Sequence, residues 1–558
     1  MGDERHVIGI DFGTLSGRAV VVRAGDGEEL GSAEYKYPHG VMDRELAETG
    51  ERLPPDWALQ DPQDYIDVLR HAVPEAVKAA GVDPASVVGI GTDFTSCTIM
   101  PTRGDGTPLC RLDEFRGRPH AYAKLWKHHA AQPQADRVTE VAAERGEPWL
   151  SRYGGRISSE WAIAKALQVL EEDTEIYDRM ERWIEAGDWI VWQLCGEEVR
   201  SACPAGYKAM YQDGRYPDAD YFEALDARFR DFAEQKLGAS LAELGARAGT
   251  LTDAAAEWTG LKHGIAVAVG NVDAHVTAPA AQATDPGRMV VVMGTSNCHV
   301  IVGDELAEVP GMCGVVKGGL VPGRWGYEAG QTGVGDIFAW FVDQAVPPYY
   351  HEQARDRGLG IHQYLTELAD EQEVGEHGLV ALDWWNGNRS ILVDHNLRGV
   401  LVGMSLATRP EDIYRALIES TAFGTRKIIE AFGDAGVTVD ELVTTGGLLD
   451  NPVLMQIYTD VVNRPLGVLE SAQGPALGSA IHAAVAAGVH EDIETAAARM
   501  GKVRREVYSP NPRRAEAYDR VYRVYGRLHD WFGRESRDLM ADLQSIAADA
   551  RKGERVEH

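Results

Sequence analysis

The sequence predicts an α/β protein of two similar domains that face each other across a cleft. At 558 residues the chain exceeds what one hydrophobic core normally supports, so two domains are expected. A motif of apolar strand, glycine-hydroxyl turn and second apolar strand occurs twice, in VIGIDFGTLSGRAVVV (7–22) and RMVVVMGTSNCHVIVGDEL (288–306), about half the chain apart. Chance similarity of two glycine hairpins is the alternative. Apolar runs that end in glycine and an acid, with helical stretches between them, are typical of open α/β sheets.

The first motif combines features of a hairpin with features of a phosphate site. Asp11 ends its first strand. Thr14 and Ser16 supply hydroxyls, and Gly13 leaves the neighbouring backbone N–H groups open to close approach by a ligand. A purely structural hairpin with a solvated acid is the alternative interpretation.

The following segments alternate in the same way. Residues 61–81 predict a helix, and VVGIGTDFTSCTIM (87–100) predicts a strand that leads to Asp93. GIAVAVGNVDAHVTAPAA (264–281) predicts a strand that leads to Asp273 and a helix, so Asp273 is either a site residue or a helix cap. A helix over 410–433 is expected to start with a capping box of Thr408-Arg409-Pro410-Glu411 spacing.

The last third of the chain contains a second ligand-type turn. In TTGGLLDNPVLMQIYTDVVNRPL (444–466) a strand ends at Gly446-Gly447 and a helix opens near Asn451-Pro452, which favours approach of a flat ring or a phosphate over an ordinary turn. Near the C-terminus, aromatic and aliphatic residues recur at helical spacing and predict a core-facing stripe. These are Tyr518, Val521, Tyr522, Tyr525, Leu528 and Phe532.

Composition restricts the partners. The net charge of −31 disfavours nucleic acid and anionic membranes as partners. The six cysteines form no C-x-x-C pair, the first predicted strand begins too early for a signal peptide, and no apolar run approaches a membrane span. We therefore expect a reducing, cytoplasmic location.

Two phosphate-type hairpins, a diglycine turn and strand-end acids, without a Rossmann or Walker motif, favour ATP-dependent phosphoryl transfer. In order along the chain, IGIDFGT, GTDFTSCT, AYAKLWKHHA (121–130), AGYKAMY (205–211), GNVDAH, VMGTSNCH, YEAGQTGVGDIFAWF (327–341), LDWWNGNRS (382–390) and GPALGSAIHAA (474–484) resemble the FGGY family of carbohydrate kinases. That family belongs to the superfamily of actin, hexokinase and the Hsp70 ATPase. The resemblance implies two actin-like (ribonuclease H-like) domains, here expected at 1–285 and 286–558, the second ending in an amphipathic helix.

The resemblance also implies roles for individual residues. Asp273 matches the catalytic base, and Asp11 matches the acid near the Mg²⁺ that accompanies ATP. Ser96, Lys208 and Glu328, together with Asp273, match sugar-binding positions, although a surface lysine and a surface glutamate are the alternatives for Lys208 and Glu328. Trp126, His128 and His129 are expected on a basic, aromatic helix near the sugar.

For the nucleotide, the resemblance implies that the two hairpins hold phosphates from opposite sides and that the diglycine turn borders adenosine. The expected phosphate residues are Gly13, Thr14 and Ser16 on one side and Gly294, Thr295 and Ser296 on the other, and the adenosine residues are Gly446, Gly447 and Asn451. Because water could otherwise accept the phosphoryl group, we expect the domains to close when the sugar binds.

The expected substrate is a 2-ketopentose, phosphorylated at its terminal hydroxyl. Kinases for D-ribulose, xylulose or glycerol remain alternatives, as does a non-catalytic sugar sensor, whereas a chaperone-type ATPase lacks room for a substrate-binding module. Ser96 stands where a small residue such as alanine is expected, and its hydroxyl could shift the preferred epimer. A homodimer is one compatible assembly.

Overall fold

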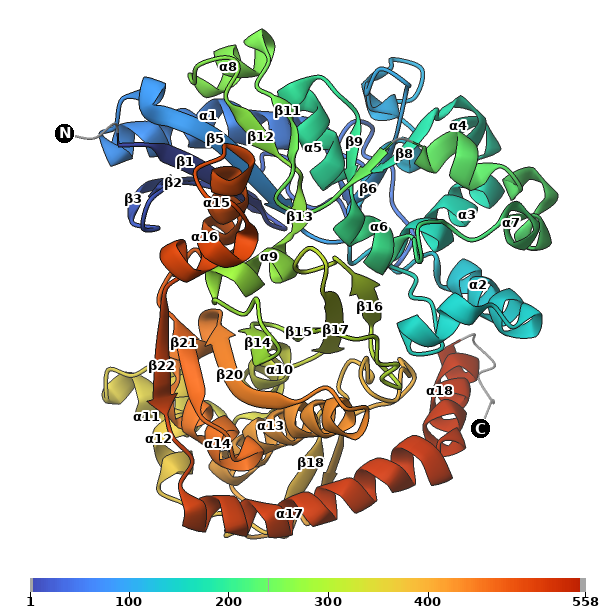
Figure 1. Ribbon diagram of the computed structural model, residues 1–558. Helices are drawn as coiled ribbons and strands as arrows, with labels where there is room; N and C mark the ends of the chain where they lie inside the picture. The colour runs from blue at the N-terminus through green and yellow to red at the C-terminus, as the bar shows by residue number, and fades with distance from the viewer. Residues whose placement is uncertain (1–3, 239, 552–558) are drawn as a thin grey trace.

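The computed structural model describes residues 4–238 and 240–551 and contains two sheets that share one plan (Figure 1). In the first half, β1 (His6–Phe12), β2 (Ser16–Arg23) and β3 (Glu29–Lys36) are antiparallel neighbours. On the other side of β1, β5 (Val87–Phe94) and β12 (Ala266–Ala268) continue the sheet in parallel, and β11 (Arg247–Thr250) closes it. The short strand β13 (Asn271–Val272) also pairs in parallel with β5.

The second half repeats this order. The antiparallel neighbours are β14 (Gly287–Met293), β15 (Asn297–Gly303), β17 (Trp325–Gln331) and β16 (Gly314–Lys317). On the other side of β14, β20 (Val439–Thr445) and β21 (Leu466–Leu469) run parallel, and β22 (Val503–Tyr508) closes the sheet. The predicted duplication of an α/β unit is therefore confirmed at the level of sheet topology.

The remaining elements connect or cover these sheets. In the first half they are β4 (Leu59–Gln60), α1 (Pro62–Ala80), β6 (Ile99–Thr102), β7 (Ala123–Lys124), α2 (Gln132–Arg145), α3 (Ala162–Glu172), α4 (Thr174–Arg179), β8 (Arg182–Glu185), α5 (Ala186–Cys195), β9 (Val199–Ser201), α6 (Ala202–Lys208), α7 (Ala219–Leu225), β10 (Ser240–Ala242), α8 (Asp253–Thr259) and α9 (Asp273–Ala280). In the second half they are α10 (Gly335–Ala345), α11 (Pro348–Asp356), α12 (Ile361–Asp370), β18 (Val380–Leu382), β19 (Val400–Val402), α13 (Pro410–Asp434), α14 (Pro452–Val462), α15 (Gly474–Ala486), α16 (Ile493–Met500), α17 (Pro512–Asp530) and α18 (Asp538–Arg551).

Helices α9 and α15 join the two halves. In Figure 1, α15 from the second half lies beside β1 and β5 of the first sheet, and it contacts both strands. It also crosses α9, which in turn contacts β14 and β15. The backbones approach so closely that a Cβ on Gly9 would collide with the Ala476 carbonyl oxygen, and one on Gly478 with the Val276 carbonyl oxygen. Small residues thus allow one tightly packed junction between the sheets.

This contact predicts the cost of adding one methyl group. We expect Gly9→Ala to lower the free energy of unfolding by about 1–3 kcal/mol or more, because backbone atoms of α15 must move to admit the Cβ. Gly25→Ala is the matched control, since a Cβ there would meet nothing within 4 Å. Thermal denaturation of the two variants measures the difference, and equal melting temperatures would contradict the packing argument.

Two of the predicted helices are confirmed, with one local correction. The 61–81 helix is α1, capped by Asp61 and ended by Gly81 at φ +66°. The 410–433 helix is α13, but its capping box lies one residue later than predicted: Arg409 is the N-cap, and the Asp412 carboxylate accepts from the Arg409 N–H at 2.8 Å.

The expected helix over 121–130 is wrong. Residues 123–124 form β7, which pairs with β4 and β6, and a turn follows. His128 is buried in that turn, where its Nδ1 accepts from the Ala58 N–H at 3.2 Å and its Nε2 hydrogen-bonds to Gln168 at 2.9 Å. Tertiary hydrogen bonds therefore override the helical composition of the segment.

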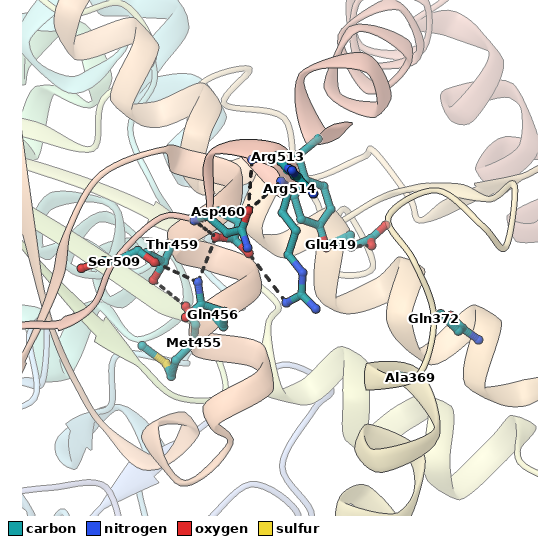
Figure 2. Close-up of polar contacts among 12 residues, drawn as sticks. Ala369, Gln372, Glu419, Met455, Gln456, Thr459, Asp460, Ser509, Arg513 and Arg514 are labelled. Atoms are coloured by element: carbon teal, nitrogen blue, oxygen red, sulfur yellow. Dashed lines mark hydrogen bonds and ion pairs between the residues drawn. The ribbon is translucent and has the colours of Figure 1, made fainter. Parts of the chain in front are cut away.

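The C-terminal stripe packs as predicted. Tyr518, Tyr522 and Tyr525 on α17 are buried, and Val521, Leu528 and Phe532 pack against the same core. Figure 2 shows Gln456 and Asp460 of α14 beside the start of α17. There Asn511 caps α17, and its own N–H donates to Asp460 at 2.7 Å. Within the residues that the structure describes, no helix is long and apolar enough to cross a membrane.

Candidate active site

The first hairpin is closed by a hydrogen bond of its own backbone and is contacted by side chains from other segments. The Gly13 N–H donates to the Ser16 carbonyl at 2.9 Å, which closes the loop. Trp126 Nε1 donates to the Thr14 hydroxyl at 3.1 Å, so that hydroxyl can still donate its own hydrogen to a ligand. The Ser16 hydroxyl donates to Glu34 at 2.6 Å and is therefore already engaged. Trp126 thus lies at the expected phosphate loop, although not on the expected helix.

The second hairpin is anchored in a different way. The N–H groups of Val334 and Gly335 donate to the carbonyls of Thr295 and Gly294 at 2.8 and 3.0 Å, which fixes the loop at the start of α10. The diglycine turn reaches the same place, because Gly446 has φ +106° and a Cβ there would collide with the Met293 carbonyl. A Cβ on Gly447 would meet nothing within 4 Å, so its backbone is open to approach. The Gly446-Gly447 turn thus packs against the end of β14, directly before the second hairpin.

Asn451 has a structural duty at this turn. It is the N-cap of α14, where its Oδ1 accepts from the Leu454 N–H at 3.0 Å, and its Nδ2 donates to the Thr366 hydroxyl at 3.0 Å. Both polar groups of the Asn451 side chain are therefore used within the protein, and the helix opens where the sequence predicts.

A row of polar residues crosses four strands of the first sheet. Arg18 on β2, Asp11 on β1, Asp93 on β5 and Asn271 on β13 are successive cross-strand partners. Burial raises the pKa of Asp11, and burial together with the Asp11 charge raises the pKa of Asp93 well above its usual range. Asp93 also accepts a 2.5 Å hydrogen bond from Ser479 of α15, so the row reaches the second half of the chain.

Asp273 lies two residues after Asn271, the last member of this row. It is the first residue of α9, with Val272 at the N-cap position, and its Oδ1 accepts from the Ala274 N–H at 2.6 Å. Burial, and then the Asp11 charge, raises the pKa of Asp273 to about 7. A carboxyl group with this pKa can exchange a proton near neutral pH, which is what general base chemistry requires.

Glu328 is the centre of a buried ionic cluster that joins the two halves. Its carboxylate accepts from Lys208 Nζ at 2.8 Å, from Arg389 at 2.6 Å and from His275 Nε2 at 3.1 Å. The Lys208 and Glu328 side chains are each only 3% exposed, which rules out the surface alternative for both. Burial alone would raise the pKa of Glu328, but Lys208 and Arg389 hold it well below its usual range.

The other members of the cluster have defined protonation states. Burial alone would lower the pKa of Lys208, yet the Glu328 carboxylate raises it, so the ammonium is retained. Burial lowers the pKa of His275, and its neutral ring can donate from Nε2 to Glu328 and accept at Nδ1 from the Cys203 thiol, 3.1 Å away. Asp273 feels the charges of both Glu328 and Lys208.

The structure therefore connects most of the predicted residues. Asp11, Asp273, Lys208 and Glu328 form one electrostatic group, and α9, which starts at Asp273, packs on the strands of the second hairpin. Ser96 is the second residue after β5 and contacts Cys97, with 3.4 Å between the Oγ and Sγ atoms. Arg389 and His275 were not identified from the sequence, although the segments LDWWNGNRS and GNVDAH that contain them were, because only the fold brings them to Glu328.

The fold and this site define a sugar kinase of the actin-like class. The N-terminal domain of the FGGY family of carbohydrate kinases matches residues 6–279, and the C-terminal domain of that family matches residues 289–487. The chain belongs to the FGGY family of carbohydrate kinases.

Two relatives that match this chain over nearly its whole length are both ribulokinases. A ribulokinase from Mycolicibacterium smegmatis is 60% identical over 556 residues, covering 100% of this chain and 99% of that protein. A ribulokinase from Anoxybacillus flavithermus is 52% identical and covers 98% of each chain.

Solved structures agree on the fold. A xylulose kinase from Rhodospirillum rubrum superposes with a TM-score of 0.75 at 24% identity, covering 95% of this chain and 99% of that one. A glycerol kinase from Plasmodium falciparum, solved with ADP, has a TM-score of 0.72 at 15% identity, with 94% and 98% of the two chains covered. The predicted fold class, an α/β protein with two similar domains of the kind found in these kinases, is therefore confirmed.

Proposed function

We propose that this protein is a ribulokinase, which transfers the γ-phosphoryl group of ATP to the 5-hydroxyl of L-ribulose and so serves L-arabinose catabolism. The products are L-ribulose 5-phosphate and ADP. The full-length identity to the two ribulokinases supports this substrate. The observation that carries the chemistry is the Asp273 carboxyl, with its pKa near 7, beside Asp11 and the Lys208–Glu328 pair.

Asp273 acts as the general base. It accepts the proton of the 5-hydroxyl as that oxygen bonds to the γ-phosphorus and the bond to ADP breaks. Lys208, Glu328 and Ser96 bind the other hydroxyls, because a dry site rich in fixed donors and acceptors discriminates between epimers. The Ser96 hydroxyl is the group to test first if the epimer preference differs from L-ribulose.

The donor nucleotide binds between the two hairpins. Gly13 and Thr14 face its phosphates from the first hairpin, with Ser16 contributing its backbone because its hydroxyl is engaged by Glu34. Gly294, Thr295 and Ser296 face the phosphates from the second hairpin. Gly446 and Gly447 border adenosine, and the open space above Gly447 fits that role. Asn451 supports this edge as the cap of α14.

Mg²⁺ fits beside Asp11. The chemistry of this row suits a hard cation, since carboxylate oxygens prevail and a buried oxygen of Asp93 has no hydrogen-bond partner among the described residues. Bound Mg²⁺ would supply positive charge that offsets the negative charge of the phosphates. Asp11 would hold it through water, and Arg18 and Asp93 would fix the position of Asp11.

The two catalytic lobes correspond to residues 1–285 and 286–558 and close on the sugar. Contacts at the outer edge of the lobes support this movement: the Ser151 hydroxyl donates to Glu308 at 3.1 Å, and Arg156 donates to the Val393 carbonyl at 3.2 Å. Polar contacts of this kind separate more easily than the packed α9–α15 junction, and closure on the sugar would bring α6 and β16 into the contact that they make in this structure.

The substrate is tested by a coupled assay of ADP release. We expect the purified protein to turn over L-ribulose with a higher kcat/KM than D-ribulose, L-xylulose, D-xylulose or glycerol. ADP release measured without sugar gives the background rate of ATP hydrolysis. Turnover confined to glycerol, or to none of the ketopentoses, would remove the ribulokinase assignment.

The pH profile tests the state of the base. Because burial raises the folded pKa of Asp273 to about 7, the carboxyl is protonated below that pH and cannot accept the sugar proton. We therefore expect kcat/KM for L-ribulose to fall about tenfold per unit of pH well below 7 and to level off above it. A profile that stays flat from about pH 5.5 to 8 would contradict this assignment.

A further inference from the structure

A small cavity, with room for about one water-sized group, adjoins Ser96, one of the proposed sugar-binding residues. It is lined by Ser96 at the end of β5, by Glu185 and Asp188 at the start of α5, and by Asn271 and Val272, which precede Asp273. A second cavity shares Glu185 and Asp188 and continues beneath α6. The lining of the first cavity comes entirely from residues 94–272, so neither phosphate hairpin takes part in it.

Two residues that line this cavity each have one buried polar atom without a hydrogen-bond partner within residues 4–238 and 240–551. These atoms are Oε1 of Glu185 and Nδ2 of Asn271. The Asn271 side chain is oriented by its Oδ1, which accepts from the Val272 N–H at 2.8 Å, and the residue is 4% exposed. By contrast, Asp188 in the same wall accepts from the Ser201 N–H at 2.9 Å.

An unpartnered acceptor and an unpartnered donor, on two residues that line the same cavity, are complementary to a hydroxyl group, which both donates and accepts. Leaving a buried donor or acceptor unpaired is costly, so a ligand that pairs both atoms gains affinity. Burial, and then the Asp188 charge, raises the pKa of Glu185 to about 8, so its carboxyl can also donate near neutral pH. Of the proposed ligands ATP, Mg²⁺ and ketopentose, the ketopentose is the small molecule that carries hydroxyl groups along its whole carbon chain.

The position of the cavity selects one end of the sugar. The reacting hydroxyl must face the nucleotide, which the proposed function assigns to the two phosphate hairpins. No residue of either hairpin lines the cavity, so we assign the cavity to the end of the sugar that points away from the nucleotide. In a ketopentose phosphorylated at C5, that end carries the C1 hydroxyl.

We propose that Glu185 and Asn271 are specificity-determining residues that bind the C1 hydroxyl of the ketopentose. This inference rests on the proposed function, since it assigns a role within the same substrate site. Glu185 accepts from or donates to the hydroxyl, Asn271 donates to it, and Ser96 forms the passage between the cavity and the reacting end.

The test combines deletion of the hydroxyl with deletion of its partners. Initial rates are measured with L-ribulose and 1-deoxy-L-ribulose for the wild type, Glu185→Met, Glu185→Gln and Asn271→Ala. We expect the wild type to prefer L-ribulose by about 10- to 100-fold in kcat/KM, as hydrogen bonds of this kind contribute. Glu185→Met and Asn271→Ala should lose most of that preference, measured as the ratio of kcat/KM between the two sugars. Glu185→Gln, which keeps hydrogen-bonding groups, should retain much of it.

Asp188→Asn is the matched control, because Asp188 lies in the same wall but already has a partner. Its ratio between the two sugars should equal that of the wild type. If Glu185→Met and Asn271→Ala reduce both sugars equally, the cavity is structural and the inference fails while the ribulokinase assignment stands. If the wild type does not phosphorylate L-ribulose, the proposed function itself fails. Because Glu185 and Asn271 are varied separately, a variant that does not fold leaves the other to decide.

Discussion

Replacing Asp273 by asparagine lowers kcat for L-ribulose by about 10²- to 10⁴-fold, the contribution typical of a general base. The asparagine side chain has nearly the same shape as the aspartate and can still hydrogen-bond to a hydroxyl, but it cannot take up the proton. The KM for the sugar should therefore change far less than kcat. Steady-state kinetics by coupled ADP release measures both.

The same variant offers a second measurement. Since the acidic fall in activity is assigned to Asp273, the residual turnover of Asp273→Asn should lose that fall and become nearly independent of pH around 7. Circular dichroism and thermal denaturation serve as folding controls. Undiminished turnover, or an unchanged pH profile, would eliminate Asp273 as the base.

Replacing Glu328 by glutamine destabilises the protein by about 3–5 kcal/mol and abolishes productive sugar binding. The change leaves Lys208 and Arg389 close together with no carboxylate between them, in a place where the Lys208 side chain is 3% exposed. Burial of an uncompensated charge is the physical reason for the loss. Thermal denaturation and the KM for L-ribulose measure the two effects.

A double variant separates stability from function. In Lys208→Met with Glu328→Leu, an apolar pair replaces the buried ion pair, and stability should recover part of the loss because Lys208 and Glu328 no longer have to be desolvated, while Arg389 still lacks its carboxylate partner. Sugar turnover should not recover, since the donors and acceptors for hydroxyls are gone. Recovery of turnover in the double variant would show that the pair only holds the two halves together.

The sequence predicted the structure correctly where a short segment contains its own capping and turn residues. The two hairpins, α1 with its Asp61 cap and Gly81 stop, and the opening of α14 at Asn451 all follow from capping and turn preferences that act over a few residues. The capping box of α13 was displaced by one residue, because Asp412 rather than Glu411 reaches back to the N-cap.

The segment 121–130 is a case in which the local sequence predicts the wrong structure. Its composition suits a helix, yet Lys124 pairs with Leu59 of β4 and His128 bonds to Ala58 and Gln168. These partners are distant in sequence, so no local pattern reports them. Trp126 nevertheless reaches the Thr14 hydroxyl, so the segment serves the site through a different geometry than the one predicted.

The sequence by itself determined the duplicated α/β plan and most residues that carry charge into the site, because strand periodicity, glycine turns and acids at strand ends are local properties. Only the tertiary structure decided which charges neutralise one another. Arg389 and His275 meet Glu328, Asn271 pairs with Asp93, and Asn271 and Glu185 line one cavity, because parallel strands and packed helices bring distant residues together. Protonation states follow from those contacts, since burial and neighbouring charge, rather than residue type, set each pKa.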